Sequence, residues 1–334
     1  MGNDSLWTAP PAEALRAGPG FRLEELDRAG TPGWTGDKDA AKDATTARGA
    51  DLSDLQERLF AHGRTGGDRS VLLVLQGLDT AGKGGIVRHV IGMVDPQGVS
   101  LASFGVPTPI ETSHHHLWRI RRALPQPGKI GVFDRSHYEQ VLVVKVDELE
   151  PPEVNVRRYA ELNRFDEGIM ASGTTLIKVA LMVSYEEQGA RLRERLERPD
   201  KYWKYEPGDI DTRKKWGDFQ AAYQEMFTST STGTAPWYVV PADHKWYARL
   251  AVTELLHGAL AGLDLGWPKA DFRPAVEKRR LAATMAEPDR VSTERSDDSS
   301  TPEQARQGDV AASEKKKKKK KNPKKKSDKK DTKK

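Results

Sequence analysis

The sequence predicts an α/β fold of three layers, in which helices cover both faces of a parallel five-stranded sheet. Two observations predict it: five apolar runs of strand length alternate with segments of helical periodicity, and the first run ends in a glycine-rich turn. Such alternation is typical of parallel strands joined by right-handed crossover helices. Ligands of these folds bind at the carboxyl ends of the strands, so we look for the functional residues there.

The first strand is predicted in "SVLLVLQG" (70–77), a continuous apolar run that is typical of a strand buried on both faces. The other four strands are predicted at 99–105, 129–134, 175–183 and 237–242. Helices are predicted before and between the strands, at 52–63, 82–93, 112–123, 154–171, 209–227 and 244–262.

Composition divides the chain into three parts. Residues 1–50 are rich in Gly, Pro, Ala and Asp, and they predict an extended N-terminal arm anchored by Trp7, Phe21 and Trp34. Residues 51–273 form the predicted α/β domain, with a helical lid at about 184–215. Residues 274–334 contain too little apolar surface to offset the entropy of the chain, so we expect them to be disordered.

Charge and composition exclude several classes of protein. The Lys-rich end at 315–334 carries 14 Lys and 2 Asp, and the other 314 residues carry a net charge of −7, so the overall +5 does not indicate a basic fold. The chain has no cysteine, which excludes disulfides and thiolate catalysis. Apolar runs stay short of the ~20 residues that a membrane span needs, and the N-terminus does not resemble a signal peptide. We therefore expect a cytoplasmic protein without membrane contact.

The stretch "GLDTAGKGG" (77–85) resembles a phosphate-binding loop. Gly77, Gly82 and Lys83 match the pattern G-x-x-x-x-G-K, in which backbone N–H groups and a lysine face one anion. The pattern follows a buried strand and opens an amphipathic helix, which is the context that separates such a loop from an ordinary glycine-rich turn. Gly84 stands where a Ser or Thr hydroxyl usually holds magnesium, so another oxygen has to take that role.

Two carboxylates are candidates to hold the metal. Asp79 lies inside the loop, where phosphates would repel it unless a divalent cation stood between them. Asp134 ends the third predicted strand in "KIGVFDRSHYE", and Arg135 follows it at the same edge of the sheet. The alternative for Asp79 is a simple turn residue.

An arginine-rich segment follows the fourth predicted strand. In "RLRERLERPDKYWK" (191–204), Arg191, Arg195 and Arg198 fall on one face of a helix, and Lys201 and Lys204 continue the positive charge. A solvated, salt-bridged face would look similar, because Glu187 lies one turn before Arg191. The position after the fourth strand favours a mobile lid that closes over phosphates.

From about Gly20 to Asp271 the chain resembles the type-2 polyphosphate kinase family. The motifs that carry the resemblance are "GLDTAGKGG", "FGVPT", "HLWR", "FDRSHYE", "RYAELNRFD", "RLRERLERPDKYWK" and "APWYVVPADHKWYARL". The resemblance implies a P-loop kinase fold and Mg²⁺-dependent phosphate transfer between inorganic polyphosphate and a nucleotide, with Mn²⁺ as an alternative ion.

The resemblance also implies roles for individual residues. Asp79, Lys83, Asp134 and Arg135 are the candidate catalytic residues, and Asp79 and Asp134 are the candidate metal ligands. The candidate phosphate- and nucleotide-binding residues are Gly77, Gly82, Gly84, Gly85, Arg88, Glu139, Arg191, Arg195, Lys201 and Lys204. "SHYE" (136–139) resembles the subgroup that acts on both AMP and ADP.

The chain departs from the family pattern in three places. His115 replaces an aspartate, Asp166 replaces a glutamate, and the fourth predicted strand, "KVALMVS", lacks the usual aromatic residues and histidine. The motif "SHHHLWR" also suggests a metal site, but adjacent histidines on a helix point about 100° apart. We therefore predict that the three histidines do not bind one ion together, and that they mark the start of a helix.

Two other functions remain open from the sequence: an ATP-dependent small-molecule kinase of the same fold, and a non-catalytic polyanion-binding protein. The Lys-rich end could capture long polyphosphate, or it could solubilise the chain or touch nucleic acid. We also expect a homo-oligomer.

Overall fold

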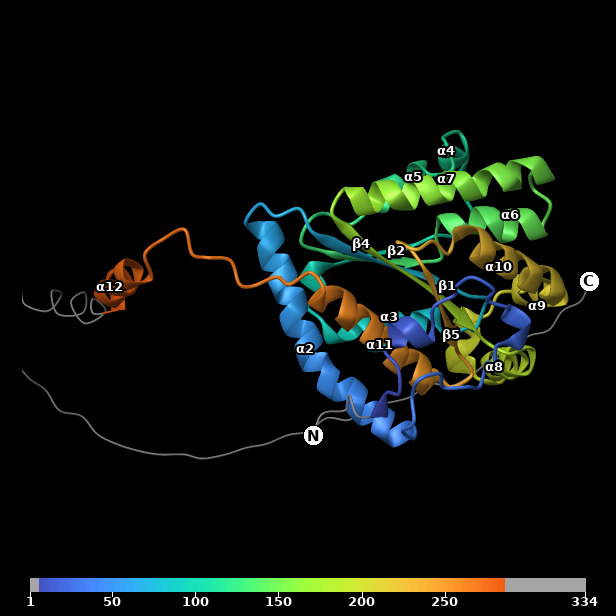
Figure 1. The fold of residues 1–334 in the computed structure, drawn as a ribbon, viewed down its shortest axis with the longest axis horizontal. Coiled ribbons are helices and arrows are strands. Elements are labelled where there is room, and N and C mark those ends of the chain that lie inside the picture. Colours follow the sequence, from blue (N-terminus) through green and yellow to red (C-terminus); the bar gives the residue numbers. More distant parts are fainter. Residues whose placement is uncertain (1–5, 286–334) are drawn as a thin grey trace, which may run out of the picture. The chain divides into compact units, whose positions relative to one another are not determined.

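The structure is a computed structural model that describes residues 6–285. Its centre is a five-stranded parallel sheet with the strand order β2-β3-β1-β4-β5 and with helices on both faces (Figure 1). The strands are β1 (Ser70–Gln76), β2 (Val99–Ser103), β3 (Ile130–Asp134), β4 (Thr174–Met182) and β5 (Trp237–Pro241). The predicted fold class is confirmed, and all five strands lie where the apolar runs placed them.

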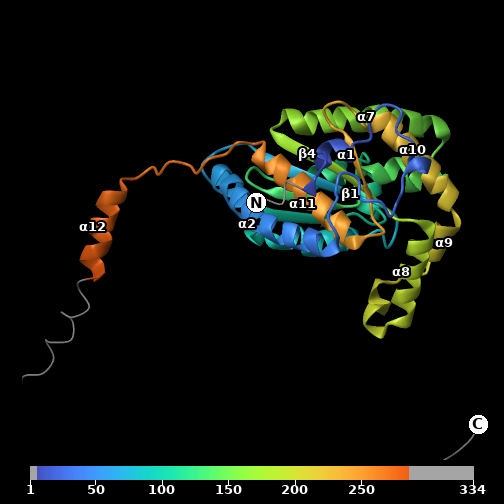
Figure 2. The same ribbon diagram turned by 60° about the horizontal axis from the view of Figure 1, so that its bottom comes forward.

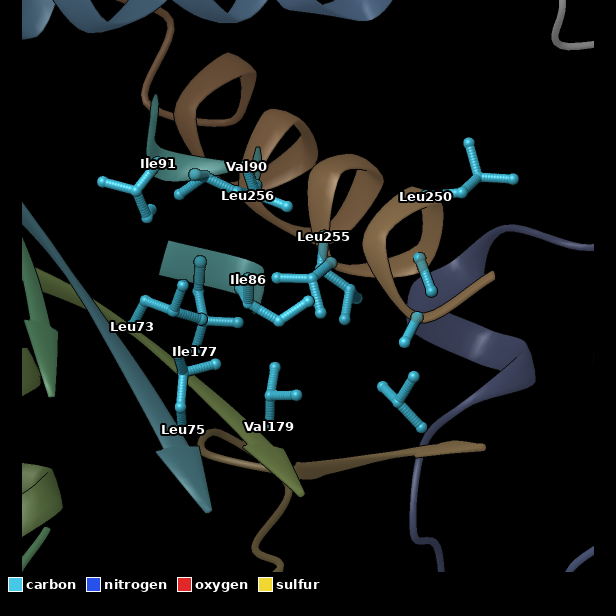
Figure 3. Packing of buried hydrophobic residues seen from close by; sticks show 14 of the residues in the cluster. Leu73, Leu75, Ile86, Val90, Ile91, Ile177, Val179, Leu250, Leu255 and Leu256 are labelled. Atoms are coloured by element: carbon cyan, nitrogen blue, oxygen red, sulfur yellow. The ribbon is translucent and has the colours of Figure 1, made fainter. Parts of the chain in front are cut away.

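One face of the sheet packs against three helices. These are α2 (Lys38–Arg64), α3 (Lys83–His89) and α11 (Lys245–Ala261). Leu73 and Leu75 of β1 point to this face, where they meet residues of α3 and α11 (Figure 3). The alternate β1 residues, Leu72 and Val74, belong to the core on the opposite face. Because β1 is apolar on both sides, its whole length is buried.

The opposite face is covered by a second set of helices, which Figure 1 shows on the other side of the sheet. They are α5 (Trp118–Ala123), α6 (Val143–Val146), α7 (Pro152–Ala171) and α10 (Trp216–Thr230). The remaining short elements are η3 (Ile91–Met93), η4 (Pro96–Gly98), α4 (Pro109–Thr112), η5 (His137–Val141), α8 (Tyr185–Glu197), η6 (Pro199–Lys204) and α9 (Gly208–Lys214). Figure 2 shows α8 and α9 projecting from one end of the molecule.

The N-terminal part differs from the predicted arm of residues 1–50. It contains α1 (Pro11–Ala14) and η2 (Leu23–Glu25), and helix α2 already begins at Lys38. The physical reason is an N-cap: the side chain of Asp37 accepts hydrogen bonds from the backbone N–H groups of Asp39 and Ala40, and an alanine-rich run follows. The segment before α2 is anchored by aromatic contacts, as predicted; the Trp7 and Trp34 rings lie 5.2 Å apart and Phe21 packs on Phe227.

The C-terminal part also differs from the prediction. The chain divides into two units, residues 1–269 and 270–334, and the second contains the helix α12 (Pro274–Met285), whose residues are exposed apart from Glu277. The expected disorder is therefore wrong for 274–285, because a proline at the start and an ion pair between Glu277 and Arg280 favour a helix there. The rest of that prediction, including the Lys-rich end at 315–334, lies outside the described residues. Within residues 6–285, each helix is too short or too polar to cross a membrane.

Candidate active site

The loop between β1 and α3 is held in a tight conformation. Gly77 has a φ of +150°, and a Cβ atom at this position would lie 2.7 Å from the carbonyl oxygen of Leu181. Thr80 adopts a φ of 68°, which is unusual for a residue with a side chain, and Gly82 is left-handed with a φ of 116°. Strained backbone of this kind persists where the surrounding structure fixes it, often at a functional site.

Lys83 opens α3 and turns back into the loop. Its Nζ atom donates hydrogen bonds to the carbonyl oxygens of Gly77 at 2.6 Å and Leu78 at 3.4 Å, and the side chain is buried. Burial lowers the pKa of Lys83, and the charges of Asp79 and Asp134 oppose that effect. An ammonium group has three N–H donors, so one remains for an incoming oxygen.

Asp134 and Arg135 lie beside the loop because β3 pairs directly with β1. Leu75 of β1 faces Asp134 in the register of the sheet, and the backbone N–H of Arg135 donates to Leu75. Arg135 has a φ of 64° and donates through Nη2 to Oδ1 of Asp79 at 2.8 Å. The structure thus gathers the four predicted catalytic residues at the carboxyl end of β1 and β3.

The charges in this group act strongly on one another. Burial would raise the pKa of Asp79, but Lys83, Arg135 and Arg195 together lower it. Burial would lower the pKa of Arg135, but Asp79 and Glu139 raise it. The half-buried Glu139, on η5, has a pKa that desolvation raises, although Arg135 and Lys83 oppose the shift. Glu139 is therefore part of the same electrostatic group.

Arg191, a predicted phosphate contact, packs against the loop. It is buried and donates to the carbonyl oxygens of Thr80 and Ala81 in the loop and of Ala242 and Asp243 after β5. Its Nε atom donates to Glu187 at 2.7 Å, so all of its nitrogens are engaged. Arg191 ties the first part of α8 to the loop and positions it, because the face of α8 that carries it packs inward.

Arg195 and Asp209 bring the predicted lid to the site. Arg195 donates to the carbonyl oxygen of Lys204 at 2.9 Å and to Oδ2 of Asp209 at 3.1 Å. Asp209, at the start of α9, is only 5% exposed, and its carboxyl group interacts with that of Asp79. Burial and the charge of Asp79 raise the pKa of Asp209. Asp209 was not among the residues predicted from the sequence, where only the turn "EPGD" after the lysines points to it.

The other predicted contacts are more peripheral. Lys201 lies 3.9 Å from a carboxylate oxygen of Asp200, and the exposed Lys204 lies over the ring of Trp203. Arg88 is exposed in the last turn of α3, near Arg249, so the structure does not group it with the loop. Gly84 and Gly85 face open space, since a Cβ atom there would meet nothing within 4 Å. The surface beside Lys83 therefore has room for a ligand.

The carboxylates of this site fit a divalent cation. The half-buried Asp79 and the buried Asp209 act on each other, and two neighbouring carboxylates are stabilised by a proton or a cation between them. The charge of Asp134 raises the pKa of Lys83 and of Arg135, the same cationic side chains that interact with Asp79. Within residues 6–285, however, the one cluster of three His, Asp or Glu side chains whose ligand atoms are close enough to share a metal ion lies elsewhere, at His115, His116 and Glu161. An ion at Asp79 and Asp134 would take its remaining ligands from phosphate oxygens and water, as Mg²⁺ commonly does.

Comparison with known proteins identifies the family. The sequence matches the family described as Polyphosphate kinase 2 (PPK2) over residues 35–264. The chain belongs to this family. It is 41% identical to the AMP/ADP-polyphosphate phosphotransferase of Meiothermus ruber, over 75% of this chain and 92% of that one. It is 38% identical to the ADP-polyphosphate phosphotransferase of Rhodopseudomonas palustris, over 69% of this chain and 82% of that one. The crystal structure of polyphosphate kinase 2 from Arthrobacter aurescens TC1 superimposes with a TM-score of 0.81 at 49% identity, covering 83% of this chain and 98% of that chain.

One departure from the expected pattern of polyphosphate kinase 2 lies in a buried polar network below the site. Asp166 of α7 accepts hydrogen bonds from His137, from the Tyr138 hydroxyl at 2.6 Å and from Lys178 of β4 at 2.9 Å. Lys178 also donates to Tyr138 and to the carbonyl oxygen of Thr230. Although burial raises the pKa of Asp166, the hydrogen bond from His137 and the charge of Lys178 lower it to about 2. This network joins α7, β4, α10 and η5 beneath Arg135 and Glu139.

Another departure, at His115, changes the prediction about metal binding by the adjacent histidines. Residues 114–117 form a turn, and α5 begins at Trp118 as a helix start was expected there. Because His115 and His116 are not on a helix, their rings lie side by side, with centroids 4.2 Å apart. The expectation that these neighbours point away from each other is therefore wrong for this pair.

Proposed function

We propose that this kinase transfers phosphate reversibly between inorganic polyphosphate and nucleotides, converting AMP to ADP and ADP to ATP. The observation that carries the proposal is the contact of Asp79 with Arg135 beside Lys83 and Asp134, in a chain of this family. The name of the Meiothermus relative, which includes both AMP and ADP, supports both acceptors.

Asp79 and Asp134 are the proposed ligands of Mg²⁺, with Mn²⁺ as an alternative. When bound, the ion would neutralise negative charge on phosphate oxygens. Asp209 would have to lose its contact with Asp79 or share the ion, since burial and the charge of Asp79 both raise its pKa.

Positioning and charge compensation account for the catalysis that we propose. An oxygen of the nucleotide phosphate attacks the terminal phosphorus of polyphosphate; one P–O bond forms, the P–O bond to the next phosphate breaks, and the shortened chain leaves with the electron pair. Lys83 and Arg135 would hold the oxygens of the transferring group, and Arg195 would reach them from α8. Such reactions require little covalent chemistry from the protein, and fixed charges supply most of the rate.

The test is a phosphotransfer assay on the full chain. Purified protein receives AMP or ADP, polyphosphate and Mg²⁺ with no other nucleotide, and the products are separated by ion-exchange chromatography. ADP and ATP should appear in the wild type, and Asp79→Asn or Asp134→Asn should lower the rate by about 100-fold or more. The matched control is Asp39→Asn, an exposed carboxylate at the start of α2 that should not change the rate. Activity of either site variant within a few-fold of wild type would contradict the assigned site.

The same assay separates the two alternative functions. A small-molecule kinase that depends on ATP would form no ATP from polyphosphate and ADP. A non-catalytic polyanion-binding protein would show no turnover at all.

We also propose that the Lys-rich end at 315–334 captures long polyphosphate. Its 14 Lys residues offer a high density of positive charge for a polyanion. A chain ending at residue 314 should keep its turnover with short polyphosphate and lose apparent affinity for long polyphosphate. An unchanged dependence on chain length would rule out capture and favour the solubilising role or nucleic-acid contact. The expected homo-oligomer stays a prediction.

A further inference from the structure

A second cluster of potential ligands lies between the turn before α5 and the middle of α7. His115 and His116 belong to the turn, and Glu161 belongs to α7. One nitrogen of each histidine and one carboxylate oxygen of Glu161 all lie within 4.8 Å of one another. None of the three belongs to the phosphate-binding loop or to the lid segment.

His116 is the central member of this cluster. Its side chain is 9% exposed, and its Nε2 atom is buried without a hydrogen-bond partner in the structure. The nearest carboxylate oxygen, on Glu161, lies 3.4 Å away. A buried ring nitrogen without a partner is costly, and it aims its lone pair or its proton at the carboxylate.

His115 completes the cluster from the solvent side. Its ring lies beside that of His116, it is exposed, and its Nδ1 atom accepts a hydrogen bond of 3.3 Å from the backbone N–H of Leu117. That bond is long, so coordination through this ring would replace a weak contact. The exposed side of His115 leaves space for a water molecule as a further ligand.

The surrounding charges set a limit on affinity. Arg158 and Arg121 both act on His116 and would repel a cation. The positive charge of Arg158 is partly offset by the carboxylate of Glu150, 3.7 Å away. The carboxylate of Glu161 offsets one further positive charge. The site is therefore best suited to an ion that binds imidazole strongly.

We propose that His115, His116 and Glu161 bind one borderline transition-metal ion of the Zn²⁺ class, which links the turn before α5 to α7. Two imidazole nitrogens and one carboxylate are a common donor set for Zn²⁺, which accepts water in its fourth position. Mg²⁺ prefers oxygen ligands and is not expected here, so this site differs chemically from the one at Asp79 and Asp134.

The test is metal titration of the full chain without polyphosphate or nucleotide, since both chelate metals. Zn²⁺ binding is followed by isothermal titration calorimetry, and Co²⁺ binding by the visible absorption that reports four-coordinate geometry. The wild type should bind one ion, and His115→Asn or Glu161→Gln should weaken binding by about tenfold or more. His114→Asn is the matched control, because this neighbouring histidine stacks on Trp118 and is not one of the clustered ligands. It should bind Zn²⁺ like the wild type.

Circular dichroism and the metal-free Tm of each variant check that the fold is intact. Zn²⁺ should raise the Tm of the wild type and of His114→Asn, but not that of the other two variants. Absence of one-to-one binding in the wild type would overturn the proposal. Equal affinity in wild type, His115→Asn and Glu161→Gln would overturn it as well, by showing that the ion binds elsewhere.

Discussion

Removing the charge of Asp166 should destabilise the protein strongly. The Asp166 and Lys178 side chains are 2% and 0% exposed, and their charged atoms lie 2.9 Å apart. In Asp166→Asn, Lys178 keeps its neutral acceptors, the Tyr138 hydroxyl and the Thr230 carbonyl, but no negative charge remains beside it. Breaking a buried ion pair by removing one partner typically costs about 3–5 kcal/mol, a large share of the ~5–15 kcal/mol that holds a domain folded.

The assay is urea unfolding at pH 7, followed by circular dichroism and by tryptophan fluorescence. Trp237 is a useful probe because Lys178 lies 5.4 Å from the centre of its ring. The double variant Asp166→Asn with Lys178→Met removes both charges, so it should recover part of the loss. Asp54→Asn, which breaks a partly exposed ion pair with Arg58 on α2, is the control and should change stability by less than about 1 kcal/mol. A loss below about 1 kcal/mol in Asp166→Asn, or strictly additive single and double variants, would refute the reasoning.

Three further predictions follow from the same structure. The pKa of Asp166 is lowered to about 2 in the folded protein, so its stabilisation is fully present above the unfolded pKa of about 4 and is lost as the pH falls toward 2. In urea titrations, the difference in unfolding free energy between wild type and Asp166→Asn should therefore shrink over that pH range. A constant difference would contradict this prediction. In Arg191→Lys, the lysine cannot donate to all four carbonyl oxygens that Arg191 contacts. We therefore expect a lower Tm in calorimetry and a lower rate of phosphate transfer. If Arg191 only bound phosphate, the Tm would stay unchanged. Gly77→Ala should reduce both stability and the rate of phosphate transfer, because the added Cβ would clash with Leu181. The control, Gly84→Ala, adds its Cβ into open space and should fold with a normal Tm. Similar Tm values for both variants would argue against the strained loop.

The sheet and the loop could be predicted because their signals are local. The apolar run of β1 is buried on both faces, and Gly77 and Gly82 of the loop sit where a left-handed backbone or a close contact requires a glycine. The start of α2 was placed too late because Asp37 acts as an N-cap only once an alanine-rich helix follows it. Composition alone also hid α12 within a segment that looked disordered.

The candidate site could be predicted only in part, because several of its contacts join distant parts of the chain. Arg191 meets Thr80, more than a hundred residues earlier, and helical spacing does not reveal which face of α8 packs inward. Asp209 contacts Asp79 through the packing of α9, and a single aspartate in a turn carries no such signal. The pairing of His115 and His116 with Glu161 required the turn before α5, which helical geometry does not describe.

The two arginines of α8 divide the predicted lid into a fixed and a releasable part. Arg191 holds the first half of α8 to the loop through buried carbonyl contacts, whereas Arg195, one turn later, is partly exposed and binds Lys204 and Asp209 within the lid segment. A lid that moved as one body from residue 184 would have to break all the contacts of Arg191 at once. We therefore expect the movement to begin after Arg191 and to carry η6 and α9, so that Asp209 leaves Asp79 when the substrate enters. Hydrogen–deuterium exchange should then show amides of 199–214 exchanging faster than those of 185–191, with polyphosphate and Mg²⁺ slowing the former. Equal exchange in both parts, with or without polyphosphate, would show that α8 moves together with the rest of the lid.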